Sequence, residues 1–290
     1  MSKYAVRLFT RKKISLKYFY FLFFAFLVLS SAVVTAQGDL LLYPKRIVFD
    51  GSRRSQTISL ANIGKDTVRY NISLVQMRMT EEGVFEVITQ PDSGQNFALK
   101  YLRFFPRNVV LPPHEAQSVK IQLVNTGETN AGEYRSHMYF RAEPVKKPLG
   151  EPEAKRDSAA ISIQLVAVFG ISIPIILRTG ESTTQVNISN ASFSWKKDTV
   201  PSLNLSLKRT GNMSVYGDVT VDYISVGGKR IRVAKVMGLA VYTPNTIRNI
   251  ILPLDKNQGI NYHTGILYIA YTTQADTKSV KLASTELKLL

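Results

Sequence analysis

The sequence ISIQLVAVFGISIPIIL, from Ile161 to Leu177, decides the fold class of this chain. Every odd position in it is apolar, whereas the even positions mix serine, glutamine, glycine and proline with valine and isoleucine. Alternation with a period of two is typical of a β-strand with one buried face. Pro174 has no N–H to donate to a ladder, so we expect its end of the strand to lie at a sheet edge or a bulge.

The length of this run is also informative, because strands are usually about five or six residues long. We expect part of the run to lack a permanent partner within its own domain. The segment before it, Val145 to Ala160, is polar, charged and proline-bearing, a composition typical of a mobile loop. An apolar strand next to such a loop favours a protein that lends a strand to another chain.

The first 36 residues have the layout of a secretory signal peptide. Six basic residues and an apolar block from Tyr18 to Leu29 precede the small residues Val34, Thr35 and Ala36. A transmembrane anchor is the alternative, but the block is shorter than the ~20 residues that a span needs. We expect cleavage after Ala36 and no stable membrane insertion of the mature chain.

The charge of the mature chain is moderately basic. The whole chain has 37 basic and 21 acidic residues; removal of the six basic residues of the leader leaves 31 − 21 = +10. The basic residues are spread along the chain in short clusters and accompany no nucleic-acid-binding motif, which favours a role in solubility over a nucleic-acid partner.

The chain contains no cysteine. Small secreted animal domains usually carry disulfides, whereas about 254 residues arranged as two domains can bury enough surface without them. An exported chain without cysteine therefore fits a bacterial periplasm, which is the location we expect.

The mature chain reads as all-β, with about seven short strands before residue 143 and turn signals between them, as in an antiparallel sandwich. The strands expected in this half are Leu40–Phe49, Gln56–Ala61, Val68–Met79, Val84–Thr89, Tyr101–Val110, Ser118–Val124 and Tyr134–Ala142. A polar, glycine-bearing segment, Arg178 to Thr184, then has the composition of a linker. We expect a first domain over residues 37–178 and a second over 179–290.

The second half shows the same pattern. The strands expected in it are Val186–Trp195, Ser202–Lys208, Gly217–Ile224, Lys229–Val236, Ile247–Pro253, Gly265–Thr272 and Lys278–Leu287. Two sandwiches of roughly 140 and 110 residues fit the usual size of a domain.

Several segments resemble, in the same order, the periplasmic chaperones of chaperone–usher pilus assembly. The first, YPKRIVFDG at Tyr43–Gly51, resembles the first strand of these chaperones. The others are Ser55–Asn62, Val110–Glu115 with Ser118–Ile121, Gly132–Pro144, Ile161–Leu177 and, in the second half, Arg209–Gly217. Each segment alone is a weak signal, and their order and spacing make the resemblance specific.

This resemblance implies two immunoglobulin-like domains set at an angle, with a cleft between them. In the family, the chaperone lends its long alternating strand to pilin subunits that lack one strand. The implied partners are pilin-like fimbrial subunits, and whether an outer-membrane usher takes part stays open. We expect Ile161, Ile163 and Leu165 to contact the client, and Phe169 to Ile175 to belong to the core of the domain.

A basic pair in the cleft of the family holds the terminal carboxylate of the pilin, and this chain matches it only in part. Arg46 stands at the position of the first-strand arginine and is expected to bind the client, since a guanidinium can bind a carboxylate with two parallel hydrogen bonds. The second cation, a lysine in the long strand, has no counterpart between Ile161 and Ile176. Lys45 or a residue from another strand could substitute, or strand pairing alone could hold the subunit.

Catalytic or metal chemistry has little support. The three histidines are far apart, and no nucleophile elbow, phosphate-binding glycine loop or zinc motif is present. We expect His114 in a turn, His137 on the surface of a strand and Trp195 in the core of the second domain. The chain is therefore predicted to be a non-enzymatic protein without cofactor or metal.

Two functions remain. The first is a chaperone for subunits of surface fibres, and the alternative is a structural or adhesive β-sandwich protein of such a fibre. The strand from Ile161 favours the chaperone, because an exposed apolar edge promotes aggregation unless it is protected or used.

Overall fold

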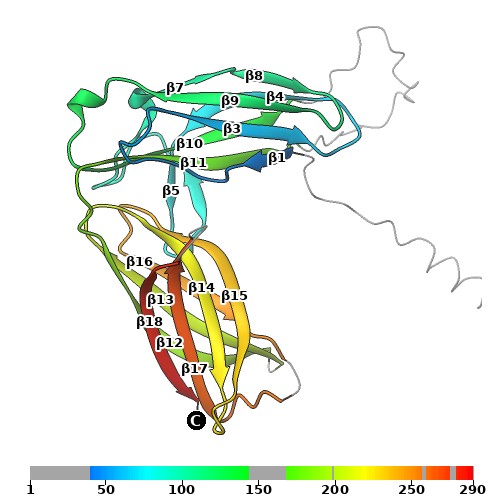
Figure 1. Ribbon diagram of the computed structural model, residues 1–290, viewed down its shortest axis with the longest axis vertical. Helices are drawn as coiled ribbons and strands as arrows, with labels where there is room; N and C mark the ends of the chain where they lie inside the picture. The colour runs from blue at the N-terminus through cyan, green and yellow to red at the C-terminus, as the bar shows by residue number, and fades with distance from the viewer. Residues whose placement is uncertain (1–39, 144–167, 198, 257–258, 275–278, 290) are drawn as a thin grey trace, which may run out of the picture. The chain divides into compact units, whose positions relative to one another are not determined.

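The computed structural model describes residues 40–143, 168–197, 199–256, 259–274 and 279–289 (Figure 1). All of them lie in one compact unit, Asp39–Leu290. The described residues form two β-sandwiches with two single-turn 3₁₀ helices, η1 (Leu99–Tyr101) and η2 (Thr126–Glu128). Within these ranges no helix has the length and apolar character needed to span a membrane.

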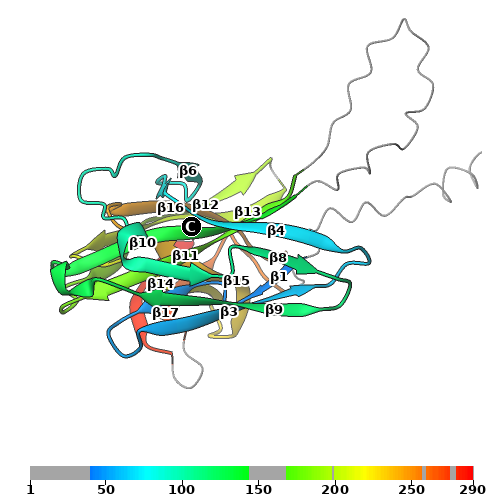
Figure 2. The same cartoon turned by 90° about the horizontal axis from the view of Figure 1, so that it is seen from above.

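The N-terminal sandwich consists of two facing sheets, which are seen from above in Figure 2. The first sheet has the order β1 (Leu40–Tyr43), β3 (Ser55–Asn62), β9 (Ala116–Leu123), β7 (Leu102–Phe105). The second has the order β2 (Ile47–Phe49), β11 (Gly170–Thr179), β10 (Gly132–Ala142), β4 (Val68–Val75), β8 (Asn108–Leu111). This order is that of an immunoglobulin-like sandwich. All pairs are antiparallel except β2 with β11, which is parallel.

The core of this sandwich lies between the two sheets and follows the predicted alternation. Ile173, Ile175 and Leu177 of β11 are buried in it, together with Met138 and Phe140 of β10 and Ile58 and Leu60 of β3. Ile171 is partly buried against the same cluster. The expectation that Phe169 to Ile175 belong to the core is confirmed for Ile173 and Ile175, but it is wrong for Phe169, which precedes β11 and is 54% exposed.

Three predicted strands are each divided in the structure. Leu40–Phe49 becomes β1 and β2, and Tyr101–Val110 becomes β7 and β8, with the two members of each pair in different sheets. Both breaks occur at a proline, Pro44 and Pro106, whose missing N–H cannot continue a ladder. The buried positions change from even to odd across both breaks, from Leu40 and Leu42 to Ile47 and Phe49, and from Leu102 to Val109 and Leu111.

The third divided strand, Val68–Met79, separates after Val75. Its last part becomes β5 (Met77–Met79), which pairs with β6 (Phe85–Val87) in a two-stranded sheet of its own. We call this ribbon the β5–β6 hairpin. All three residues of β6 are exposed. The hairpin contacts the C-terminal sandwich, where Asn249 donates its N–H to the carbonyl of Glu81 at 2.7 Å.

The C-terminal sandwich begins at β12 (Gln185–Lys196), and five residues separate β12 from the end of β11. One sheet has the order β12, β13 (Val200–Thr210), β16 (Ile247–Pro253), and the other the order β15 (Arg230–Val241), β14 (Val215–Ile224), β17 (Gly265–Thr273), β18 (Lys281–Leu289). The seven strands predicted in this half are confirmed. Trp195 packs half-buried against the core between these sheets, beside Phe193 and Tyr262.

Candidate functional site

Strand β11 has one open edge. It pairs with β10 along its whole length, from Gly170 opposite Arg141 to Thr179 opposite Gly132. On its other side β2 pairs only with Ile175–Leu177. From Gly170 to Pro174, no described strand lies on that side. This part of β11 therefore has a partner on one side only among the described strands, in keeping with the expectation.

The register shows which backbone groups face this open edge. Ala142 donates its N–H to the carbonyl of Phe169 at 2.9 Å, so odd residues of β11 direct their N–H and C=O groups to β10, and even residues direct theirs away. Ser172 and Gly170 therefore present backbone groups to the open side. Pro174 is also an even residue, so its missing N–H removes no bond to β10. The expectation of an edge at Pro174 is confirmed.

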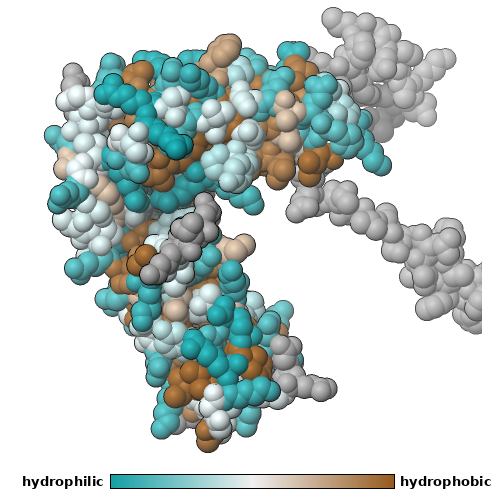
Figure 3. All heavy atoms as spheres, in the orientation of Figure 1, coloured by the Kyte–Doolittle hydropathy of each residue, from teal (hydrophilic) through white to brown (hydrophobic). Residues whose placement is uncertain are grey.

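The residues expected to contact the client, Ile161, Ile163 and Leu165, lie outside the described residues, as does the segment Val145–Ala160. The described chain resumes at Val168 and Phe169, which are 38% and 54% exposed. They directly precede the part of β11 that has only β10 beside it. Figure 3 shows other apolar areas on the face turned to the viewer as separate patches among hydrophilic residues.

Arg46 lies just before β2 and is partly buried rather than freely exposed. Its Cζ atom is 4.5 Å from the ring centroid of Tyr216 and 6.0 Å from that of Tyr242. Its Nε and Nη2 atoms are buried and have no hydrogen-bond partner among the described residues. Burial lowers the pKa of Arg46, but a guanidinium stays protonated in proteins.

A second arginine lies close to Arg46. In the register of the sheet, Val48, Ile176 and Arg135 form one row across β2, β11 and β10. Side chains in such a row share a face, so Arg135 lies one strand beyond β11 on the face that carries Val48. The Cζ atom of Arg135 is 4.5 Å from the ring centroid of Tyr242, the same ring that Arg46 approaches.

Arg135 was not predicted as a site residue, although the sequence contains a signal for it. The odd positions of β10 carry Glu133, Arg135 and His137, a row of charged and polar side chains on one face of a strand. All three are at most 2% exposed. Buried polar residues in a row are unusual and indicate a site.

The two carboxylate oxygens of Glu133 differ, because Oε2 has several hydrogen-bond partners whereas Oε1 is buried without one among the described residues. Its Oε2 atom accepts hydrogen bonds from Arg178 Nε at 3.1 Å, from Ser214 N at 3.0 Å and from Ser214 Oγ at 2.7 Å. Arg178 also donates to the carbonyl of Ser214 at 2.7 Å. Glu133 therefore joins the two sandwiches through Arg178 and Ser214 and forms no hydrogen bond with Arg135.

The prediction that His137 lies on the surface of its strand is wrong. The side chain of His137 points away from the apolar core, as its alternation with Met138 indicates. However, His137 is buried, with only 2% of its surface exposed. The face is covered by the β5–β6 hairpin, whose Phe85 ring meets that of His137 edge-on at 5.1 Å. Burial, with the nearby charge of Arg135, lowers the pKa of His137 to about 3. His114, by contrast, lies in the expected turn, with φ of 60°.

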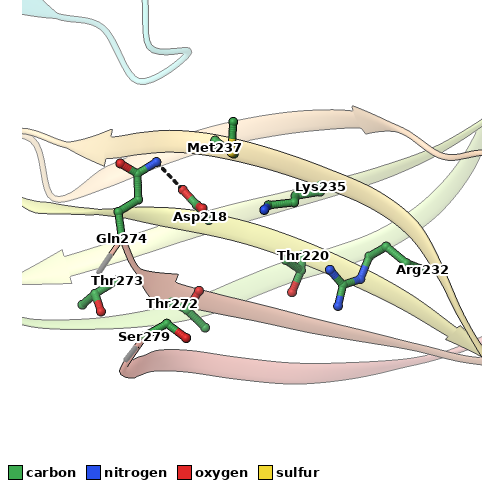
Figure 4. A pocket seen from close by; sticks show the side chains of 9 residues that line it. All are labelled: Asp218, Thr220, Arg232, Lys235, Met237, Thr272, Thr273, Gln274 and Ser279. Carbon is green, nitrogen blue, oxygen red and sulfur yellow. Dashed lines mark hydrogen bonds between the residues drawn. The ribbon is translucent and has the colours of Figure 1, made fainter. Parts of the chain in front are cut away.

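Two open hollows adjoin each other, and Arg46 lines one of them. One, of about 640 Å³, is lined by Lys45, Arg46, Val48 and Tyr216 together with Met237 and Gln274. The other, of about 680 Å³, lies over β14, β15 and β17 and shares Met237 and Gln274 with the first (Figure 4). In it, Gln274 Nε2 donates to Asp218 at 2.6 Å, and Lys235 and Arg232 project from β15.

No group of three potential metal-binding residues (His, Cys, Asp or Glu) occurs within the described ranges. The chemistry that the Arg46 region offers is anion binding: two guanidinium groups near one tyrosine ring, with unused donors.

Comparison with known proteins gives no matching family model and no matching curated protein. Three of the solved structures that are similar to this chain are of chaperones. The YadV chaperone is 11% identical with a TM-score of 0.42, and the alignment covers 87% of this chain and 100% of that one. The CupB2 chaperone of Pseudomonas aeruginosa is 12% identical with a TM-score of 0.43, covering 86% and 100%.

The third is a complex of the SafA pilin with the SafB chaperone from Salmonella enterica, at 13% identity and a TM-score of 0.39, covering 88% of this chain and 98% of that one. These likenesses are distant. The two-sandwich fold described above rests on the chain's own strand order.

Proposed function

We propose that this protein is a periplasmic chaperone that binds pilin-like fimbrial subunits by lending them a β-strand before fibre assembly. The observation that carries the proposal is the open edge of β11 from Gly170 to Pro174, on a strand whose apolar alternation begins at Ile161 in the sequence. Long apolar edges are normally blocked, because they pair with other chains. An edge that is left open in an exported protein is therefore suited to controlled pairing with a client.

The strand would act in two ways. Its outward N–H and C=O groups would form a ladder with an edge strand of the subunit, and its alternate apolar side chains would fill the groove left by the missing strand. Ile161, Ile163 and Leu165 are assigned to the second role. Arg46 would hold the terminal carboxylate of the subunit through its unused Nε and Nη2 donors.

The test uses co-expression with a pilin-like subunit from the same genome, followed by affinity purification from periplasmic extract. Ile163→Asp should abolish recovery of the subunit while the chaperone itself stays folded. Ser162→Asp is the matched control, since it adds the same charge on the opposite face, and it should retain recovery. If both variants recover the subunit as the parent does, strand lending by this segment is excluded.

Two further arms separate the chaperone from a fibre component. A subunit supplied with its own missing strand by genetic fusion should no longer bind, because its groove is already filled. The chain should also be absent from purified fibres. Its presence as a repeating component of the fibre would favour the structural or adhesive alternative.

A further inference from the structure

The two strands of the β5–β6 hairpin direct different backbone groups to their outer edges. Thr80 donates its N–H to the carbonyl of Val84 at 2.8 Å, and Ile88 donates to that of Gln76 at 2.9 Å. In an antiparallel pair such bonds alternate along each strand. The even residues of the hairpin therefore bond across it, whereas the odd residues direct their N–H and C=O groups outward. These odd residues are Met77 and Met79 in β5, and Phe85 and Val87 in β6.

The outer edge of β5 is closed by side-chain amides. The carbonyl of Met77 accepts a hydrogen bond from Gln95 Nε2 at 3.0 Å, and that of Met79 accepts one from Asn245 Nδ2 at 2.6 Å. Met79 is also buried in a small cluster that includes Tyr242. Strand β5 is therefore held in place on the side that faces away from β6.

The outer edge of β6 is open. No described strand lies beside it, and no described residue bonds to the backbone groups that Phe85 and Val87 direct outward. Exposed apolar side chains accompany this edge, since Val84 is 58% exposed, Phe85 43% and Val87 71%. An open edge with exposed apolar side chains pairs readily with other chains. Because β5 is fixed, the edge of β6 is presented to a partner in a defined position.

The hairpin is also an acidic region of a basic chain. Residues 77–87 contain three glutamates and one arginine, a net charge of 1 − 3 = −2, whereas the whole chain has 37 basic and 21 acidic residues. The three glutamates are exposed. The single cation, Arg78, is shared by Glu86 at 3.7 Å and Asp92 at 3.3 Å. These charges favour a basic partner, since opposite charges on neighbouring strands stabilise their pairing.

We propose that the outer edge of β6 is a docking site for an extended segment of another protein, in which apolar residues alternate with lysine or arginine. The segment adds a third strand to the hairpin. Its backbone bonds to Phe85 and Val87, its apolar side chains lie beside those of the same two residues, and a cation lies opposite Glu86. The inference does not rest on the proposed function, because β6 and β11 belong to different sheets.

The first test measures binding of a basic peptide by fluorescence anisotropy. The peptide alternates lysine and valine over about eight residues, a little longer than a usual strand. A peptide that alternates glutamate and valine should bind at least about tenfold more weakly. Val87→Pro should weaken binding of the lysine peptide by at least about tenfold, because it removes an outward N–H but no bond to β5. Val87→Thr keeps that N–H and should lose no more than about threefold.

The second test reverses the charge of the hairpin. Glu86→Lys should weaken binding of the lysine peptide by about tenfold and strengthen binding of the glutamate peptide. Glu181→Lys, at an exposed glutamate outside the hairpin, is the matched control and should bind both peptides as the parent does. Equal binding of the two peptides by the parent, or unchanged discrimination by Glu86→Lys, would overturn the basic partner.

Amide hydrogen exchange locates the bound peptide. Binding should slow exchange of the Phe85 and Val87 N–H groups and leave that of Glu86, which faces β5, nearly unchanged. Slower exchange at Ser172 without a change at Val87 would place the peptide on the open edge of β11 and overturn the site.

The same measurement checks that the hairpin of Val87→Pro is still in place. The N–H of Asn249, which bonds to the carbonyl of Glu81, should remain protected in this variant. If it does not, Glu86→Lys and the exchange data on the parent decide the proposal.

Two further outcomes would contradict the proposal. Failure of the lysine peptide to bind the parent would exclude the partner proposed. Self-association of the parent in sedimentation velocity, lost in Val87→Pro, would identify a second copy of this chain as the occupant of the edge instead.

Discussion

The two halves of β11 differ in their surroundings although they belong to one strand. Ile175–Leu177 has β10 on one side and β2 on the other, and all three residues are buried. Gly170–Pro174 has β10 alone, and its burial decreases toward an exposed Phe169. The comparison shows that alternation sets which face is apolar, whereas the neighbouring strands decide whether that strand is structural or available for pairing.

The largest expected effect concerns Ile173, which lies in the half of β11 with the open edge but points into the core. Ile173→Asp should lower the free energy of unfolding by several kcal/mol, since Ile173 is 3% exposed in the core and an unpaired buried carboxylate is very unfavourable. Urea denaturation gives the measurement. Ile163→Asp should unfold at nearly the parent urea concentration. Equal destabilisation by the two changes would remove the distinction between the core residue Ile173 and the proposed client-binding residue Ile163.

The next effect concerns His137, on the covered face of the neighbouring strand β10. Its pKa of about 3 in the folded protein lies below the ordinary value of about 6.5, so the unfolded chain takes up the proton first. The free energy of unfolding should therefore fall as the pH drops from about 6.5 to about 3, by at most about 1.4 kcal/mol per pH unit from this residue.

Urea denaturation at a series of pH values, with His137→Phe as the comparison, checks this contribution. The variant should show a shallower loss of stability over the same range, because it cannot take up the proton. Identical slopes for parent and variant would mean that the ring of His137 is not buried in solution.

A smaller effect is expected at Arg46. Arg46→Ala should weaken binding of a subunit by about ten- to a hundredfold, which corresponds to the roughly 1.5–3 kcal/mol of a charge-assisted hydrogen bond. Its melting temperature should not fall, because two guanidinium nitrogens of Arg46 are buried without partners. Calorimetry with the parent and the variant measures the binding, and equal affinities would show that Arg46 has no part in it.

The smallest effect is expected at Lys45, the neighbour of Arg46 in the same hollow. Its side chain is exposed, and exposed ion pairs contribute little, so Lys45→Ala should change subunit affinity by no more than about threefold. The same calorimetric titration serves here. A loss as large as that of Arg46→Ala would identify Lys45 as a second cation that binds the client.

Much of the fold could be predicted from sequence, because hydrophobic alternation and turn residues are local signals. The seven strands of the C-terminal half were predicted in this way, as was the inward face of β11. The breaks at Pro44 and Pro106 were not, because each segment was interpreted as one strand although its buried positions change from even to odd at the proline. A change of partner strand is a long-range property that a local pattern does not contain.

The site was predictable only in part, for the same reason. Arg46 was identified from the segment around it, and the absence of a lysine in β11 was read directly from the sequence. Arg46 and Arg135 both lie near the ring of Tyr242, and His137 is covered by Phe85. Both aromatic residues are distant in the sequence from the side chains that they contact. A polar side chain on the outer face of a strand reads as exposed until the elements that cover it are known.

The most direct test of strand lending is amide hydrogen exchange in β11 with and without a bound subunit. In the free protein the Ser172 N–H faces the open edge, so it should exchange fast, while those of Ile171 and Ile173 should already be protected by β10. Subunit binding should slow exchange at Ser172 by at least about tenfold and leave its two neighbours nearly unchanged. Unchanged exchange at Ser172 in a saturated complex would contradict pairing of a client with this edge.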